Sequence, residues 1–193
     1  MPRGTDRGGY MAGDRGARRQ ACVDKARFEL ASLAERGVVL VGNAFSQVLL
    51  VKGDLGEGEL GAGLLGGRDG VALKAALSRL GFAPEDFAVL SAIGADGAPL
   101  AGPLAREAVL CADPATLVLL DETAANVAKE AFAAELATVE DFECAMLMPG
   151  RVAHVLGMRA MNLGGFEAAL DDPQEKQVMW ARLKQLGPLG EPY

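Results

Sequence analysis

The chain has 193 residues, of which 50% are hydrophobic and 23% are charged, and its formal net charge at pH 7 is −7. This length and composition suit one globular domain with a sizeable core and exclude an intrinsically disordered chain. No window approaches the roughly 18 consecutive apolar residues of a membrane span, and no secretory signal is visible, so we expect a cytoplasmic protein with no membrane partner.

The first 20 residues differ from the rest of the chain in composition. They carry five arginines and two aspartates, and they have few apolar side chains to bury. Such a composition predicts a flexible, solvated basic arm at residues 1–20. The remainder, residues 21–193, is acidic and is expected to form a single α/β domain. An acidic body repels a phosphate backbone, which disfavours non-specific binding of nucleic acid.

An amphipathic helix, a short apolar strand and a polar turn come next. Apolar residues recur at helical spacing over residues 22–36, and Gly37 suits the left-handed end of a helix. Residues 38–41 form a continuous apolar run, which predicts a central strand covered on both faces in a parallel sheet. The segment Gly42–Ser46 follows directly and is therefore expected to leave the end of that strand.

The remaining pattern alternates strands with helices. Residues 52–70 contain eight glycines and predict a long loop. The elements predicted after it are a helix at 71–80, a strand at 87–90, a helix at 104–111, a strand at 117–120, a helix at 124–136, a strand at 144–148, a helix at 152–156, a strand at 158–163 and a helix at 173–186. This alternation predicts a three-layer α/β/α fold with a four- or five-stranded, mostly parallel sheet.

Polar residues follow several of the predicted strands. In open parallel sheets, ligands bind outside the carboxyl ends of the strands. We therefore expect these loops to meet at one edge of the sheet and to form a cleft there. The residues expected to bind a ligand in it are Gly42, Asn43, Ala44, Phe45, Ser46, Ser91 and Asn162.

Familiar catalytic and cofactor motifs are missing from the sequence. The glycine-rich segment lacks the GxxxxGK(S/T) of a P-loop, and its one GxGxxG match, Gly56–Gly61, lies outside a strand-to-helix turn. A nucleotide-binding enzyme stays an alternative only if that match contacts phosphate. The single histidine, His154, has no accompanying GxSxG, and the three cysteines show no CxxC spacing. The sequence predicts neither a metal nor a cofactor.

The order of these segments nevertheless resembles the uracil-DNA glycosylase superfamily. The resemblance covers about residues 28–186 and rests on VLVGNAFS, on the glycine-led helix in GGRDGVALKAALSRLGF, on ATLVLLDETAANVA, and on the spacing of Pro173, Lys176, Trp180 and Leu183. It implies the fold of that superfamily, a hydrolase of DNA repair, and a nucleobase or DNA as ligand. It also implies that Asn43 positions a water, Phe45 stacks on the base and Asn162 donates to it.

The departures from this family fall on its chemistry. Asn43 stands where the family has an acid, and an amide cannot take a proton from water at neutral pH. The family's histidine and its cluster cysteines have no counterparts. We therefore expect a divergent relative that binds a nucleobase or another small ligand, with weakened or absent glycosylase chemistry. The alternative is a non-enzymatic protein that binds a protein partner and keeps a vestigial pocket.

Overall fold

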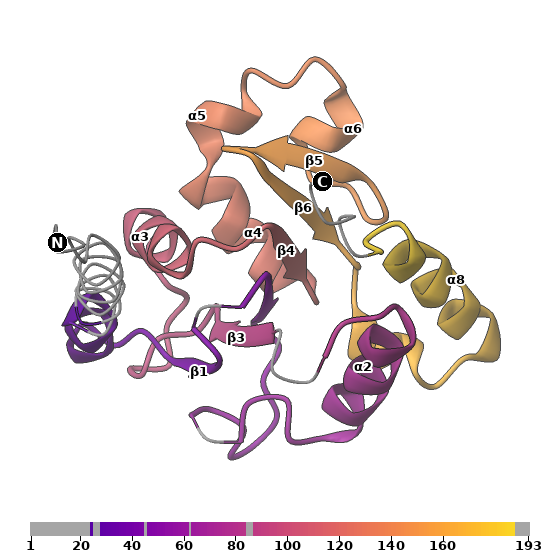
Figure 1. The fold of residues 1–193 in the computed structure, drawn as a ribbon, viewed down its shortest axis with the longest axis horizontal. Coiled ribbons are helices and arrows are strands. Elements are labelled where there is room, and N and C mark those ends of the chain that lie inside the picture. Colours follow the sequence, from indigo (N-terminus) through magenta and orange to yellow (C-terminus); the bar gives the residue numbers. More distant parts are fainter. Residues whose placement is uncertain (1–23, 25–27, 45, 62, 84–86, 188–193) are drawn as a thin grey trace, which may run out of the picture.

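A computed structural model describes residues 24, 28–44, 46–61, 63–83 and 87–187 of the chain. The described strands form one six-stranded sheet with helices on both faces, which makes a three-layer α/β/α fold (Figure 1). The fold class is as predicted, but the sheet has more strands than the four or five expected. The predicted basic arm at residues 1–20 lies outside the described residues.

Most of the predicted elements are present. The structure contains β1 (Leu40–Gly42), β2 (Val48–Lys52), α2 (Arg68–Arg79), β3 (Phe87–Ser91), α3 (Gly102–Ala112), β4 (Thr116–Leu119), α4 (Glu122–Ala131), α5 (Ala133–Leu136), α6 (Phe142–Ala145), β5 (Val152–Val155), β6 (Met158–Asn162), α7 (Phe166–Ala169) and α8 (Pro173–Lys184). Residues 28–35 are also helical. The predicted counterparts of α2, β3, α3, β4, α4, β6 and α8 are confirmed.

Among the described residues, no helix combines the length and hydropathy needed to cross a bilayer.

The winding of the sheet identifies its topological switch point. The strand order is β1-β3-β2-β4-β6-β5. The central strands are parallel to one another, whereas the edge strands β1 and β5 run antiparallel to their neighbours. The chain passes from β2 through α2 to β3, and then returns past β2 through α3 to β4. The winding therefore reverses between β2 and β4, and ligands of such sheets bind at the carboxyl ends of those strands.

Strand β2 separates two hydrophobic cores. Leu49 and Val51 pack on the face covered by the N-terminal helix, α3 and α4. Val48 and Leu50 pack on the opposite face, which α2, α7 and α8 cover. All of these side chains are at most 3% exposed. A central parallel strand is buried on both faces, so its sequence is continuously apolar instead of alternating.

The largest correction concerns the strand predicted at residues 38–41. It forms β1 at the edge of the sheet, antiparallel to β3, and its residues are only partly buried or exposed. The central strand is instead β2, which was not among the predicted elements. Both strands are brief apolar runs, and composition alone does not show which of them is central or in which direction it runs.

Two predictions in the C-terminal half are also wrong. Residues 144–148 were expected to form a strand, but they include the last two residues of helix α6, whose N-cap Asp141 accepts the N–H of Cys144 at 2.9 Å. Residues 152–156 were expected to form a helix, but they contain β5, which forms a hairpin with β6. The two turn residues, Leu156 and Gly157, have φ values of 51° and 85°. A type I′ turn requires positive φ at both positions.

An ion pair between α3 and α5 gives the fold a testable pH dependence. Arg106 donates to Oε2 of Glu135 at 2.8 Å, and this side-chain hydrogen bond lowers the pKa of Glu135. A carboxyl group with a lowered folded pKa stabilises the fold above its unfolded pKa, near 4.3, and this contribution is lost as the pH falls through the folded value. Glu135→Gln should therefore lose less stability than the wild type between pH 6 and pH 3.

Urea unfolding at a series of pH values measures this difference. Glu140→Gln is the matched control, because Glu140 is exposed and has no ion-pair partner among the described residues. Its pH dependence should follow that of the wild type. Identical curves for Glu135→Gln and the wild type would show that the pair does not contribute.

Candidate functional site

A small recess lies at the switch point of the sheet. Its volume is about 50 Å³, and its walls come from the end of β2, the start of α2, the end of β4 and the first turn of α7. One buried water needs about 10–15 Å³ of such space, so the recess holds a few waters, and a larger ligand would have to displace them and extend past the exposed rim at Asp54. Its place at the carboxyl ends of β2 and β4 is where doubly wound sheets bind ligands.

Lys52, the last residue of β2, is the cation of this recess. Its side chain is 2% exposed. Its Nζ donates to Glu59 at 2.7 Å, to Asp69 at 2.7 Å and to Glu167 at 3.2 Å. Burial lowers the pKa of the Lys52 ammonium, but the hydrogen bonds to these carboxylates raise it by more, and the net shift is upward. Lys52 is therefore held as a cation, and all of its N–H donors are used.

Asp69, in the first turn of α2, supplies an unused acceptor. Its side chain is 2% exposed, and its Oδ2 accepts from Lys52 at 2.7 Å. Its Oδ1 is buried without a hydrogen-bond partner among the described residues. Leaving a buried polar atom unpaired costs on the order of 1–3 kcal/mol. A water or a ligand that donates an N–H or O–H group would satisfy this oxygen.

Asp121 fixes the loop after β2 against the start of α4. Its Oδ1 accepts the N–H of Ala124 at 2.8 Å and caps α4. Its Oδ2 accepts the N–H groups of Gly53 and Asp54 at 2.8 and 3.1 Å. Glycine is required at Gly53 because a Cβ there would lie 2.6 Å from the Cβ of Thr123. These contacts hold one wall of the recess in place.

The residue predicted to be catalytic, Asn43, lies at the opposite edge of the sheet. Strand β1 runs antiparallel to β3 and pairs Gly42 with Ala88, near the start of β3. Asn43 and Ala44 follow β1 and therefore lie at the amino ends of the parallel strands. The expectation that all of the strand-end loops meet at one edge is wrong for this segment, because β1 is reversed relative to the central strands.

Ser91 and Asn162 do lie at the carboxyl edge, but hydrogen bonds to the backbone occupy their side chains. Ser91 Oγ donates to the carbonyl of Ile93 at 2.6 Å. Asn162 Nδ2 donates to the carbonyl of Leu147 at 3.1 Å, and its Oδ1 accepts the N–H of Gly164 at 2.7 Å. Strands β2 and β4 separate the two residues, which places them about 14 Å apart. The side chains of Ser91 and Asn162 therefore fix two separate loops and do not meet in one site.

The recess is therefore built from residues other than the predicted ones. Its lining includes none of Gly42, Asn43, Ala44, Ser46, Ser91 and Asn162. Ser46 Oγ donates to the carbonyl of Val48 at 2.6 Å, at the amino edge. Phe45 lies outside the described residues. The sequence signal for this recess is the apolar run at residues 48–51, which ends in Lys52 directly before a glycine-rich loop and a helix.

The GxGxxG match, Gly56–Gly61, lies in the loop between β2 and α2. This loop brings the carboxylate of Glu59 to Lys52, and the same carboxylate accepts the N–H of Gly56 at 2.7 Å. A phosphate group bound by this loop would be repelled by the carboxylate of Glu59. The arrangement disfavours the nucleotide-binding alternative.

Carboxylates dominate the lining of the recess. Lys52 is the one cation among the lining residues, and Phe166, which is 4% exposed, is the one aromatic residue among them. Among the described residues, no group of three or more His, Cys, Asp or Glu side chains is placed to hold a metal ion.

A scan against protein-family models and a comparison with curated proteins found no match to the chain.

Proposed function

We propose that the protein binds a small planar ligand that donates N–H hydrogen bonds, such as a nucleobase, in the recess at the carboxyl ends of β2 and β4. The unpaired Oδ1 of Asp69 carries this proposal, because Asp69 lines the recess and this oxygen is a buried acceptor without a hydrogen-bond partner among the described residues. Phe166 offers an apolar ring to a flat ligand. The carboxylates around Lys52 repel phosphate, so a free base fits better than a nucleotide.

The position of the recess supports a divergent uracil-DNA glycosylase-like protein. In the family pattern, a strand-end motif precedes the glycine-led helix. The strand that precedes this helix, α2, is β2, so the matching segment begins at Lys52 and not at Gly42. Lys52 is ion-paired to carboxylates, and Asn43 lies at the other edge of the sheet. The proposed role is therefore binding of a base, without the hydrolase chemistry of DNA repair.

Thermal unfolding with free bases tests this role. A ligand that binds only the folded state raises the Tm. Uracil and cytosine should raise it, whereas 1,3-dimethyluracil, which has no N–H donor, should not. Asp69→Asn should weaken base binding about tenfold or more, because a hydrogen bond to a charged acceptor contributes about 1.5–3 kcal/mol. Equal binding of uracil and 1,3-dimethyluracil would contradict the proposal.

Two further variants keep this test decisive. Asp54 lines the exposed rim of the recess, so Asp54→Asn should weaken binding without unfolding the chain. Asn43→Ala changes the opposite edge and should leave binding unchanged. If Asn43→Ala abolishes binding, the site has been assigned to the wrong edge. Release of uracil from a labelled oligonucleotide at low salt would overturn a binding role without catalysis.

A protein that binds a protein partner is the second candidate. It is favoured by the backbone hydrogen bonds that occupy Ser91 and Asn162, since these bonds leave the two residues expected to bind a ligand at this edge without free polar groups. In that case no base should raise the Tm, and a second chain should co-purify with the protein.

A further inference from the structure

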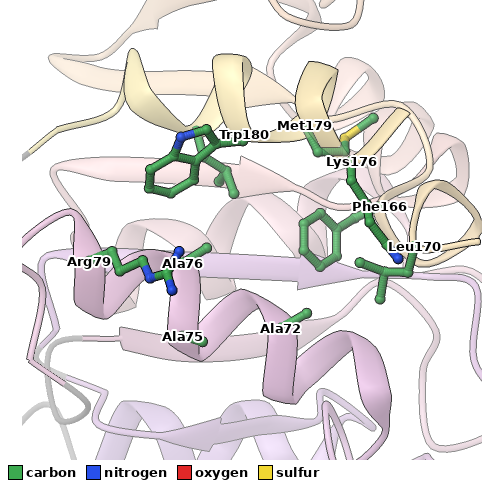
Figure 2. A pocket seen from close by; sticks show the side chains of 10 residues that line it. Ala72, Ala75, Ala76, Arg79, Phe166, Leu170, Lys176, Met179 and Trp180 are labelled. Carbon is green, nitrogen blue, oxygen red and sulfur yellow. The ribbon is translucent and has the colours of Figure 1, made fainter. Parts of the chain in front are cut away.

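A second, larger cavity lies on the outer side of the sheet. It is a groove of about 390 Å³ between α2 and α8, with α7 at one end (Figure 2). Pockets for small organic ligands have volumes of about 300–1,000 Å³. Phe166 lines both this groove and the recess, but none of the other lining residues of the groove lines the recess.

Small side chains on α2 create the groove. Ala72 and Ala76 are four residues apart and therefore lie on the same face of the helix. Opposite them, α8 contributes Met179 and Trp180. Leucine-sized residues on α2 would fill the space between the helices. The floor is therefore apolar and partly aromatic.

The charged residues that line the groove are both cations. Arg79 on α2 and Lys176 on α8 lie toward opposite ends of it (Figure 2). Neither side chain has a hydrogen bond or an ion pair with another described residue, and both residues are exposed. Asp171 near the α7 end is paired with Arg68 at 2.6 Å, and that hydrogen bond lowers the pKa of Asp171, with a smaller contribution from the charge of Lys176. In a chain of net charge −7, two cations without ion-pair partners beside an apolar floor indicate a site for a negative group.

We propose that this groove binds a small amphipathic anion, an apolar chain or ring that carries a carboxylate. The apolar body lies over the alanines of α2 and against Met179 and Phe166. The carboxylate pairs with Arg79, which lies across the groove from Trp180 (Figure 2). A guanidinium suits this role because it binds a carboxylate in a bidentate manner. Lys176 adds attraction from the other end.

The size and charge of the groove favour a small molecule over a protein. The distance along α2 from Ala72 to Arg79 is about 10 Å, or two helical turns. A stable protein interface buries about 800 Å² on each partner, which needs a much longer contact. A second copy of the chain would bring the same two cations and the same net negative charge against this face.

Trp180 reports directly on binding, because it is the single tryptophan of the chain and lines the groove. The probe is decanoate, below its critical micelle concentration, added to the full chain. We expect a saturable change in tryptophan emission. Decanol and decyltrimethylammonium have the same apolar chain without the anion, and they should bind about fivefold or more weakly, which is the effect of one partly exposed ion pair.

Variants of the groove locate the site. Arg79→Gln should weaken decanoate about fivefold, and Lys184→Gln is its control because it removes an equal charge from an exposed part of α8. Ala76→Leu should fill the groove and abolish saturable binding. Val71→Leu, at a 68% exposed position of α2 outside the groove, should leave binding unchanged.

The outcomes are separable. Equal weakening by Arg79→Gln and Lys184→Gln would overturn the proposal, because binding would then follow net charge alone. Retained binding in Ala76→Leu would also overturn it. If decanoate fails to bind and an acidic amphipathic peptide changes the Trp180 emission instead, the groove is a peptide site and the proposal is wrong. Decanoate should still bind Asp69→Asn, so this test is independent of base binding in the recess.

Discussion

Lys52→Met is expected to lower the free energy of unfolding by about 3–5 kcal/mol. The substitution leaves the carboxylates of Asp69 and Glu59, which are 2% and 16% exposed, without their cation. Removing one partner of a buried ion pair is strongly destabilising because an uncompensated charge stays buried. Urea unfolding followed by circular dichroism measures the loss.

A second variant identifies the cause. Adding Asp69→Asn to Lys52→Met removes the uncompensated buried charge, so the double variant should lose less stability than Lys52→Met alone. Lys74→Met on the exposed face of α2 is the matched control and should be near neutral. A deficit below about 1 kcal/mol at pH 7 would mean that the carboxylates do not depend on Lys52.

Gly70→Ala is expected to be the most damaging addition of a single methyl group. A Cβ at Gly70 would lie 1.8 Å from the carbonyl oxygen of Leu65, which is a backbone atom and cannot rotate away. Leu65 is itself 1% exposed, so the loop has little room to move. We expect a loss of about 3 kcal/mol, at the upper end for overpacking, measured by urea unfolding.

Gly56→Ala is the control for this substitution. A Cβ there would meet only Oε2 of Glu59, at an ordinary 3.4 Å. It should be close to neutral. Equal stability of Gly70→Ala and Gly56→Ala would show that the loop before α2 is not fixed against the helix.

The glycine-led helix shows what the sequence could predict about the fold. Leu73 and Leu77 are at most 1% exposed and face the second core, as their spacing predicts. Gly81 has a φ of 93°, and the N–H of Phe82 donates to the carbonyl of Leu77 at 3.1 Å, which ends the helix in a Schellman motif. The buried face of α2 and its glycine end depend on residues that are close in sequence, so the sequence pattern predicts both. The contact of Gly70 with Leu65 spans as few residues, but it depends on the conformation of the loop before α2, which the periodicity does not encode.

The site could be predicted only in part, because its contacts are not local. The rule that ligands bind at the carboxyl ends of parallel strands identifies an edge, but the direction of β1 is set by its pairing with β3. Residues 38–41 were expected to form a parallel strand, but β1 is antiparallel to β3, so Asn43 lies at the other edge. The partners of Lys52 lie 7, 17 and 115 residues away in the chain. The last of these comes close only because β6 lies beside β4.

Amide chemical shifts recorded by NMR during a uracil titration test directly which edge of the sheet binds ligand. Binding in the recess should shift the amides of Gly53, Asp54 and Gly165, which lie beside it, and should leave those of Asn43 and Ala44 unchanged. Shifts confined to Asn43 and Ala44, or no saturable shift at the carboxyl ends of β2 and β4, would contradict the proposed site.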